Sequence, residues 1–453
     1  MSVTLPRRDF LKGLGATAGL SACKPDPQVN SGPGTLDTIV LCMMENRSFD
    51  HVFGSLSLLE GRAVDGLLSS HGNPDLDGNW IASFLSGGSC VSDPPHGWDA
   101  SRLQMSDGNM GFVKAFQESR GGSGELVMGY LNRAQQPISY AMADRYALCQ
   151  RWFSSLLTST WPNRCYAHAA QNQGQFGNSF PEGGLYTCLT IWDLLDEAGI
   201  SWSYYYTDLP MLALFGRFGD RLKPIEFFYQ DAASGSLDQV VMVEPGAALN
   251  DDHPPHHPML GQMFIGSIHN ALATSPQWNR LMMLLYYDEA GGFFDHVVPG
   301  TAADERAAEG FDQLGFRIPA VLAGPWVKEA HLSDTVFDHT SPLAHIQAMF
   351  GLTSLTQRDA AANDLSSLID EDRLARNEPM APAELPVIEL TEEEIFAECE
   401  ETTSDFMFNG GQPELQAALR EMGLGHLDRT HENWKRARFF MDKAVELGVC
   451  TIR

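Results

Sequence analysis

Basic side chains are scarce in this sequence of 453 residues. It contains 30 lysines and arginines against 58 aspartates and glutamates, which gives a formal net charge of −28. An acidic surface of this size repels nucleic-acid phosphates and anionic membranes. The composition therefore argues against a nucleic-acid-binding protein. It suits a salt-tolerant exported enzyme, and equally a surface that is acidic only for solubility.

Long apolar runs and clustered cysteines are also missing. Beyond the amino terminus, no apolar run reaches the roughly 20 residues that a membrane-spanning helix needs. The eight cysteines show no CxxC spacing, which argues against a thiolate zinc site. Cys42 lies in an apolar run and is predicted to be a packed thiol. Cys90, Cys149, Cys165 and Cys188 could form disulfides, but their spacing does not assign the pairing.

The amino terminus has the pattern of an export signal. Arg7-Arg-Asp-Phe-Leu-Lys12 resembles a twin-arginine motif and precedes a short, weakly apolar segment. Leu20-Ser-Ala-Cys23 resembles a lipoprotein cleavage box in which Cys23 would be lipidated, with ordinary cleavage as the alternative. We therefore expect a signal peptide over residues 1–22, a tether over residues 23–35 and the twin-arginine export machinery as a partner. The expected location is periplasmic or on the outer surface, with a membrane contacted only through the lipid anchor and the substrate.

Two apolar runs, far apart in the chain, end in pairs of oxygen-bearing residues. Residues 37–44 are followed by Glu45 and Asn46, and residues 281–287 by Asp288 and Glu289. Both runs are predicted strands, and ligands of an open α/β sheet collect beyond the carboxyl ends of its strands. Carboxylates that converge there would repel one another, and a divalent cation would relieve that repulsion.

A third segment, Ser159-Thr-Trp-Pro-Asn-Arg164, has the pattern of a helix start. A hydroxyl at this place, beside Arg164 and free backbone N–H groups, is suited to attack phosphorus while the N–H groups bind the oxyanion.

Much of the rest of the chain alternates between predicted helices and strands. Helices are predicted over residues 137–147, 191–199 and 261–274, and further strands over 202–207 and 318–323. Residues 55–110 and 208–260 show no sustained period and are interpreted as loops. The alternation predicts an α/β fold with a doubly wound sheet and helices on both faces, over residues 36–354. Residues 355–453 are predicted to form a linker and a helical extension packed on that domain.

Four motifs follow one another in a fixed order. They are Glu45-Asn-Arg-Ser-Phe-Asp-His-Val-Phe-Gly54, Thr160-Trp-Pro-Asn-Arg164, Asp288-Glu-Ala-Gly-Gly-Phe-Phe-Asp-His-Val297 and Gly315-Phe-Arg-Ile-Pro-Ala-Val-Leu-Ala-Gly-Pro-Trp326. In this order they resemble the bacterial and plant phosphoesterase family of non-specific phospholipases C and AcpA-type acid phosphatases, within the alkaline-phosphatase-like superfamily. The resemblance covers roughly residues 36 to 350.

The resemblance implies one divalent metal cation held by Glu45, Asn46, Thr160, Asp288 and Glu289. These ligands are all oxygens, a set that suits a hard cation. Thr160 would be the nucleophile and would form a phosphothreonine intermediate, with Ser159 as the alternative.

The resemblance also assigns roles to four histidines. It places His96 and His253 at the substrate phosphate, with less defined roles for His296 and His339. An imidazolium, either His253 or His339, would protonate the leaving alcohol. Arg164 either stabilises charge on the phosphate or locks its turn through a salt bridge, and these two roles remain equally open.

Four functions follow from these observations. The leading one is a phospholipase C that releases diacylglycerol and a phosphorylated head group, and the second is a broad acid phosphatase acting on small phosphate monoesters. A catalytically silent binding protein would have lost a ligand or the nucleophile, and neither is missing. A redox metalloprotein would need clusters of Cys or Met ligands, which the sequence lacks.

Other residues of the motifs have structural interpretations. Arg47 and Asp50 are predicted to pair within the first motif, and Arg317 to brace the last predicted strand. The phenylalanines of the first and third motifs are predicted to be core residues.

Overall fold

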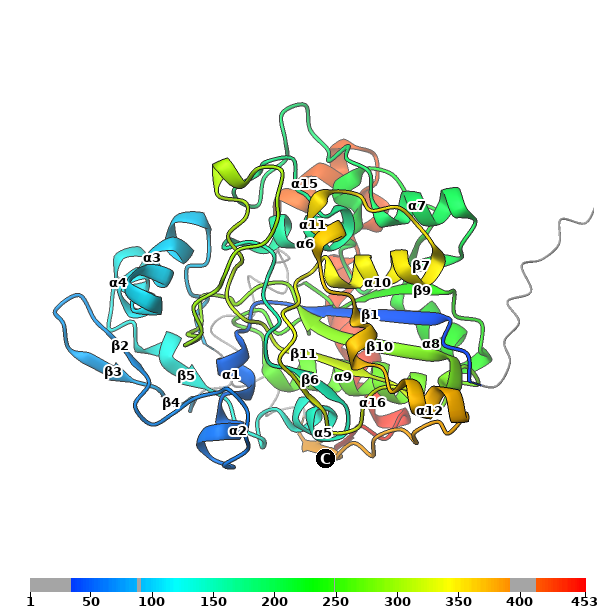
Figure 1. Cartoon of the computed structure of the whole chain (residues 1–453), viewed down its shortest axis with the longest axis horizontal. Coiled ribbons are helices and arrows are strands. Elements are labelled where there is room, and N and C mark those ends of the chain that lie inside the picture. Colours follow the sequence, from blue (N-terminus) through cyan, green and yellow to red (C-terminus); the bar gives the residue numbers. More distant parts are fainter. Residues whose placement is uncertain (1–33, 88–90, 248, 392–412) are drawn as a thin grey trace, which may run out of the picture.

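The computed structural model describes residues 34–87, 91–247, 249–391 and 413–453 (Figure 1). The expected signal peptide, Cys23 and Cys90 lie outside the described residues.

An eight-stranded sheet forms the centre of the molecule, with the strand order β12-β6-β11-β10-β1-β9-β7-β8. Among the described strands of this sheet, β11 alone runs antiparallel to its neighbours. The strands are β1 (Thr38–Met44), β6 (Ala147–Cys149), β7 (Trp202–Tyr206), β8 (Leu222–Pro224), β9 (Val240–Glu244), β10 (Leu281–Tyr287), β11 (Ala320–Ala323) and β12 (Leu332–Ser333). The predicted α/β class is confirmed, and the central sheet is mostly parallel.

The two central strands β1 and β10 are buried along their whole length because both faces of the sheet are covered. They pair in parallel, from Thr38 opposite Leu281 to Met44 opposite Tyr287. This register brings both strands to an end at the same level of the sheet. The residues that follow them therefore meet at one edge.

Helices lie on both faces of the sheet (Figure 1). The α-helices are α1 (Phe49–Phe53), α2 (Ser55–Leu58), α3 (Trp98–Asn109), α4 (Phe112–Arg120), α5 (Pro137–Arg145), α6 (Thr160–Ala169), α7 (Ile191–Ala198), α8 (Ile225–Ser234), α9 (Pro258–Ala273), α10 (Ser341–Phe350), α11 (Gln357–Ala361), α12 (Glu371–Arg376), α15 (Pro413–Glu421) and α16 (Asn433–Glu446). Short 3-10 turns are η1 (Glu125–Met128), η2 (Met211–Phe215), η3 (Trp278–Arg280), η4 (Ala307–Glu309), η5 (Leu365–Leu368), η6 (Gly425–Leu427) and η7 (Thr430–Glu432). On one face α5, α8 and α16 pack against α9, and on the other α7 and α10 pack against α6.

Two stretches interpreted as loops contain regular structure. Residues 55–110 include α2, α3, the strand β4 (Phe84–Leu85) and an antiparallel hairpin of β2 (Gly72–Pro74) and β3 (Trp80–Ala82). The strand β4 pairs with β5 (Gly129–Tyr130). Residues 208–260 include α8, β8 and β9, and β9 lies between β1 and β7 in the sheet. The loop interpretation was wrong there. The strands are too short to show a sequence period, but α8 has a helical apolar pattern at Ile225, Phe228, Tyr229 and Ala232 that was overlooked.

The carboxyl-terminal segment shares the core of the molecule. Strands β13 (Ile388–Leu390) and β14 (Cys450–Ile452) pair in parallel, and the ring of Phe440 in α16 lies 5.6 Å from Phe264 in α9. The described part of the predicted extension thus contains helices and, in addition, the two short strands β13 and β14. The domain boundary at residue 354 stays a prediction.

The described cysteines Cys42, Cys149, Cys165, Cys188 and Cys450 are free, and Cys42 is fully buried in β1 as predicted. Within the described ranges, every helix is too short or too polar to cross a bilayer.

Candidate functional site

The four predicted ligands that follow the central strands meet at the carboxyl edge of the sheet. Glu45 and Asn46 follow β1, Asp288 and Glu289 follow β10, and all four side chains are buried. The backbone N–H of Asn46 donates to Asp288 Oδ1 at 3.1 Å, and that of Arg47 donates to the Glu289 carbonyl at 3.1 Å. The in-register ends of β1 and β10 are the cause of this convergence.

Helix α6 adds Thr160 and Arg164 to this group. The buried Arg164 guanidinium donates to Glu45 Oε1 at 2.8 Å, to Glu244 Oε1 at 2.6 Å and to Asp288 Oδ2 at 3.2 Å. Thr160 begins the helix one turn earlier, and residues four apart lie on the same helix face. The ion pairs of Arg164 therefore place Thr160 on the side of α6 that faces the ligands. We call Glu45, Asn46, Glu244, Asp288, Glu289, Thr160 and Arg164 the ligand cluster.

Side-chain amides lock the start of α6. Asn163 Nδ2 donates to the carbonyls of Thr158 and Ser159 at 3.0 and 3.1 Å. Asn178 Oδ1 accepts from the Trp161 N–H at 2.8 Å, and Pro162 has no N–H. Trp161 and Pro162 therefore offer no free N–H group to an oxyanion.

Glu244 was missed in the sequence analysis. It ends β9, and its Oε2 accepts from the Met211 N–H at 3.0 Å while Oε1 binds Arg164. The signal was present, because Glu244 is an acidic residue directly after a short apolar run, just as Glu45 and Asp288 are.

The ligand cluster carries more negative charge than its protein cations neutralise. Burial raises the pKa of Glu45 well above its usual value, despite Arg164, and burial raises the pKa of Glu289 to about 8, opposed by His96 and reinforced by Asp288. Three buried acceptor atoms, Glu45 Oε2, Asn46 Oδ1 and Glu289 Oε1, form no hydrogen bond with the described residues, although His96 Nε2 lies 3.5 Å from Glu289 Oε1. Unpaired buried acceptors that are all oxygens fit a hard divalent cation.

His96 and His253 lie next to the ligand cluster. His96 Nε2 lies 3.5 Å from Glu289 Oε1, and Nδ1 lies 2.7 Å from the Pro94 carbonyl. Burial lowers the pKa of His96, but Glu289 and Asp93 outweigh this effect and raise it to about 9. The His253 ring lies 6.1 Å from that of His96, and burial lowers its pKa to about 4. The two rings thus differ in their surroundings, since the carboxylates beside His96 favour its protonated form and burial favours the neutral form of His253.

A comparison with known families bears on this site. A family model described as "Phosphoesterase family" matches residues 36–353, a range that contains every residue of the ligand cluster. The chain belongs to the phosphoesterase family. It is accordingly a hydrolase that acts on phosphoric ester bonds.

Curated relatives of this phosphoesterase align over most of its length. Non-specific phospholipase C1 of Arabidopsis thaliana is 32% identical over 409 residues, covering 79% of this chain and 75% of the relative. Non-specific phospholipase C3 of the same plant is 33% identical, with 79% of each chain covered. Phospholipase C A of Mycobacterium tuberculosis is 30% identical over 442 residues, covering 80% of this chain and 85% of the relative. Among solved structures, an alkaline phosphatase superfamily protein from Vibrio parahaemolyticus is similar with a TM-score of 0.38 and 10% identity, covering 74% of this chain and 71% of that one.

The two other predicted histidines of the phosphoesterase lie outside the ligand cluster. His339 is fully buried, with Nδ1 accepting from the Ser155 N–H at 3.1 Å and Nε2 donating to the Tyr287 carbonyl at 3.0 Å. Burial lowers its pKa to about 4. Both ring nitrogens are thus occupied in joining the loop before α6 to the end of β10, which leaves neither for a leaving group.

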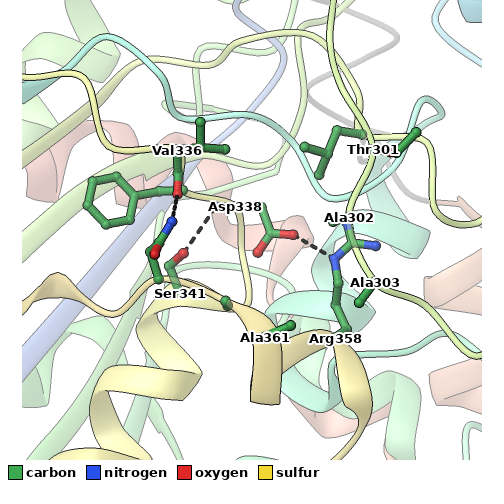
Figure 2. Close-up of a pocket in the computed structure, with 12 residues that line it drawn as sticks. Thr301, Ala302, Ala303, Val336, Asp338, Ser341, Arg358 and Ala361 are labelled. Atoms are coloured by element: carbon green, nitrogen blue, oxygen red, sulfur yellow. Dashed lines mark hydrogen bonds and ion pairs between the residues drawn. The ribbon is translucent and has the colours of Figure 1, made fainter.

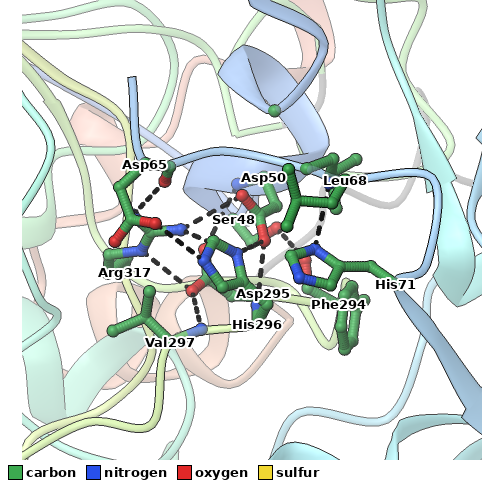
Figure 3. A network of polar contacts seen from close by, with 12 residues as sticks. Ser48, Asp50, Asp65, Leu68, His71, Phe294, Asp295, His296, Val297 and Arg317 are labelled. Carbon is green, nitrogen blue, oxygen red and sulfur yellow. Dashed lines mark hydrogen bonds and ion pairs between the residues drawn. The ribbon is translucent and has the colours of Figure 1, made fainter. Parts of the chain in front are cut away.

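His296 belongs to a second polar group, shown in Figure 3. Its Nδ1 lies 2.6 Å from Asp50 Oδ2, and the buried Arg317 donates to Asp50 Oδ1 at 3.1 Å and to Asp295 Oδ1 at 2.9 Å. His296 Nε2 lies 3.1 Å from Asp65 Oδ1. We call Asp50, Asp65, Asp295, His296 and Arg317 the Arg317 network. The predicted pair of Arg47 and Asp50 was wrong, since Arg47 donates instead to the Asp252 carbonyl at 2.8 Å.

Among the described residues, two groups of side chains have metal-ligand spacing, with ligand atoms within 4.8 Å of one another: Asp93, His96 and His253, and Asp50, Asp295 and His296. In the second group the Arg317 guanidinium already donates to both carboxylates, and His296 also pairs with Asp50. The carboxylates of this group therefore need a metal cation less, for charge balance, than those of the ligand cluster.

Two cavities lie near α6. A small one of about 10 Å³ is lined by His96, Thr158 and Glu289 among others, and a surface pocket of about 180 Å³ is shown in Figure 2. In that pocket the buried Arg358 donates to Asp338 Oδ2 at 2.8 Å and to the Ser155 carbonyl at 2.6 Å. Arg358 therefore supports the loop before α6 from behind.

Proposed function

We propose that the protein is a metal-dependent phospholipase C that cleaves phospholipids to diacylglycerol and a phosphorylated head group through a phosphothreonine intermediate. One observation carries the proposal: Thr160 starts α6 one turn before an arginine whose ion pairs reach Glu45 and Asp288. The similarity to plant and mycobacterial phospholipases C supports the choice of substrate.

Glu45, Asn46, Thr160, Asp288 and Glu289 would hold the single cation. The orphaned oxygens of Glu45, Asn46 and Glu289 are the observation that supports this set. When bound, a divalent cation lowers the pKa of a coordinated hydroxyl and offsets charge on phosphate oxygens. Arg164 is then a positioning residue, because it aligns Glu45 and Asp288 and has its donors occupied by carboxylates.

The residues of the chain would carry out two displacements at phosphorus. The Thr160 hydroxyl loses its proton to solvent, its oxygen bonds to phosphorus, and the bond from phosphorus to the glycerol oxygen breaks. His96, the imidazolium of the site, donates a proton to the departing glycerol oxygen. Water then displaces Thr160 from phosphorus and returns a proton to His96, and the Thr160 oxygen regains a proton from solvent.

The proposal includes export. Residues 1–22 would direct the folded chain through the twin-arginine pathway, and Cys23 would carry a lipid anchor at a periplasmic or outer-surface location. The Arg7 and Arg8 pair and the cleavage box at Leu20–Cys23 support this reading. Mass spectrometry of the chain purified from its cell envelope tests it, since an unmodified Cys23 would exclude the anchor.

Hydrolysis of phosphatidylcholine and of p-nitrophenyl phosphate, measured side by side, tests the function. Wild type should release diacylglycerol, and Thr160→Ala should lower that rate by at least about 10³-fold because the nucleophile is lost. Ser159→Ala removes the neighbouring hydroxyl and is the matched control, with an expected loss below about tenfold. Chelation should abolish wild-type turnover, and added metal should restore it.

The alternatives predict different results. Turnover of the monoester alone would identify a phosphomonoesterase of the acid-phosphatase type. Failure on both substrates with metal restored would favour a silent binding protein. Diacylglycerol release that persists in Thr160→Ala would contradict the nucleophile.

A further inference from the structure

The outward face of the β2–β3 hairpin is apolar although it lies in solvent. Trp80 is 54% exposed and Phe84 37% exposed, and Ala82 between them is exposed as well. Ile81 points the other way and packs on a small buried apolar cluster. Successive strand residues point to opposite faces of a sheet. Strand β3 is therefore apolar both on the face toward the protein and on the face toward solvent.

The partner strand continues this outer face. Pro74 pairs with Trp80, and Gly72 pairs with Ala82. A Cβ at Gly72 would lie 2.5 Å from Trp80 Nε1, so the indole lies against the glycine. In these described strands, the outward positions 72, 74, 80, 82 and 84 carry no charged side chain. Monomeric proteins keep such apolar patches small, and a contiguous one marks a contact surface.

The hairpin is connected to the catalytic edge of the sheet. Figure 1 shows β2 and β3 projecting beyond the end of β1 where the ligand cluster lies. Asn73, on the inner side, donates to the Asn109 carbonyl at 2.7 Å, and Asn109 donates to the Asp295 carbonyl at 2.8 Å. Asn109 thus joins the hairpin to the loop that begins with Asp288.

A lipid substrate brings a bilayer to the catalytic edge of the sheet. The cavity beside His96 and Glu289, with a volume of about 10 Å³, holds no acyl chain. The two acyl chains of a bilayer phospholipid stay in the lipid phase while its phosphodiester is cleaved, so a surface beside the site has to meet that phase.

The residues and charges of the hairpin favour one kind of lipid surface. Tryptophan and phenylalanine are typical anchors at the boundary between head groups and acyl chains, where apolar faces insert about 5–10 Å. Asp75 and Asp77 lie in the turn of the hairpin, and the whole chain carries a charge of −28. Anionic lipids are therefore repelled, and zwitterionic lipids are not.

We propose that the outer face of the β2–β3 hairpin, with Trp80 and Ala82 in β3 and Phe84 in the adjoining β4 at its centre, docks on a zwitterionic lipid bilayer. The inference rests on the proposed phospholipase activity for its choice of partner. Docking orients the catalytic edge toward the membrane without requiring a lipid anchor.

Binding to sucrose-loaded vesicles tests the proposal separately from catalysis. The full chain carries Cys23→Ser, so that no anchor forms, and Thr160→Ala, so that the vesicles stay intact. It should sediment with phosphatidylcholine vesicles and at least about tenfold less with phosphatidylglycerol vesicles. Trp80→Ser/Phe84→Ser should lower the partition coefficient on phosphatidylcholine by about tenfold or more.

Two further variants control for folding and for general hydrophobicity. Ala82→Glu places a charge at the centre of the face without removing a packed side chain, and it should also lower binding by about tenfold. Phe227→Ser removes an exposed aromatic, 48% accessible, from α8, and should leave binding unchanged. With Thr160 intact, each hairpin variant should hydrolyse a monomeric short-chain phosphatidylcholine at the wild-type rate within about twofold.

Each outcome separates the docking surface from the proposed function. Wild-type vesicle binding by Ala82→Glu and by the double variant would overturn the docking surface. A double variant that has a lower oligomeric mass in light scattering but binds vesicles like wild type would also overturn it. The face would then be a contact between copies of this chain. Hairpin-dependent vesicle binding without hydrolysis of any phosphodiester would support docking and refute the phospholipase.

Discussion

The ligand cluster and the Arg317 network each take residues from the same two segments of the chain. The segment after β1 supplies Glu45 and Asn46 to the cluster and, from α1, Asp50 to the network. The segment after β10 supplies Asp288 and Glu289 to the cluster and Asp295 to the network. The ligand cluster is buried, and so are Asp50, Asp295 and Arg317 of the network, whereas His296 and Asp65 are partly exposed. The two groups differ in how their charges are balanced.

In the Arg317 network every buried carboxylate oxygen has a donor. Asp50 meets Arg317 and His296, and Asp295 meets Arg317 and the N–H groups of Asp50 and Val297. In the ligand cluster Arg164 contacts three carboxylates, and oxygens of Glu45, Asn46 and Glu289 remain without a donor. The first arrangement stabilises the loops, and the second leaves acceptor atoms for a ligand. Satisfied hydrogen bonding, more than burial, distinguishes the supporting group from the reactive one.

Exchanging the two arginines for methionine should give the largest contrast. Arg164→Met and Arg317→Met each leave buried carboxylates uncompensated, so each should lower the free energy of unfolding by about 3–5 kcal/mol in denaturant titrations. Arg164→Met should also lower kcat on phosphatidylcholine by at least about 10³-fold, because Glu45 and Asp288 lose their alignment. The folded fraction of Arg317→Met should keep kcat within about tenfold of wild type.

Equal losses of kcat in the two arginine variants would erase the distinction between the groups. A stable Arg164→Met protein with wild-type kcat would show that Arg164 neither supports nor positions the ligands.

Metal removal should affect the ligand cluster and leave the Arg317 network unchanged. A cation whose free concentration is about a thousand times its Kd stabilises the folded state by about 4 kcal/mol. Chelation should therefore lower the Tm of wild type. Glu289→Gln removes one ligand and should make the Tm nearly insensitive to the chelator. Its chelated form should be at least as stable as chelated wild type, since burial raises the pKa of Glu289 to about 8 and ionisation there is costly.

Asp50→Asn is the matched control for metal removal, because it alters a carboxylate of the Arg317 network. Its Tm should fall on chelation by as much as that of wild type. A chelator response lost in Asp50→Asn and kept in Glu289→Gln would move the metal site to the second group.

The meeting of Glu45 and Asp288 could be predicted because β1 and β10 are continuous apolar runs that end in acidic residues. Each strand is buried on both faces, which gives a strong signal in a single sequence, and the position of a ligand at the strand end follows from the geometry of parallel sheets. Strand β9 has only four apolar residues between polar segments, so neither the strand nor Glu244 was found.

Partners within the Arg317 network could not be predicted from spacing. Asp50 lies three residues from Arg47, yet it pairs with His296 and Arg317, which are 246 and 267 residues away in sequence. Such pairs depend on how loops from different strands come together. The sequence pattern marks His296 and Arg317 as parts of motifs but carries no information on which carboxylate each one meets.

The pH dependence of stability should give the smallest but most specific contrast. Burial lowers the pKa of His296, but the hydrogen bond and charge of Asp50, with Asp295, outweigh burial and Arg317 and raise it to about 9. The unfolded value is about 6.5, so the stability that this imidazolium contributes is fully present below about pH 6.5 and is lost as pH rises through about 9. His296→Gln should therefore lower the free energy of unfolding by about 2 kcal/mol at pH 6 and by much less at pH 10, in urea titrations at both pH values. A difference that stays constant with pH would mean that His296 is neutral in the folded protein, and the charge balance of the Arg317 network would then rest on Arg317 alone.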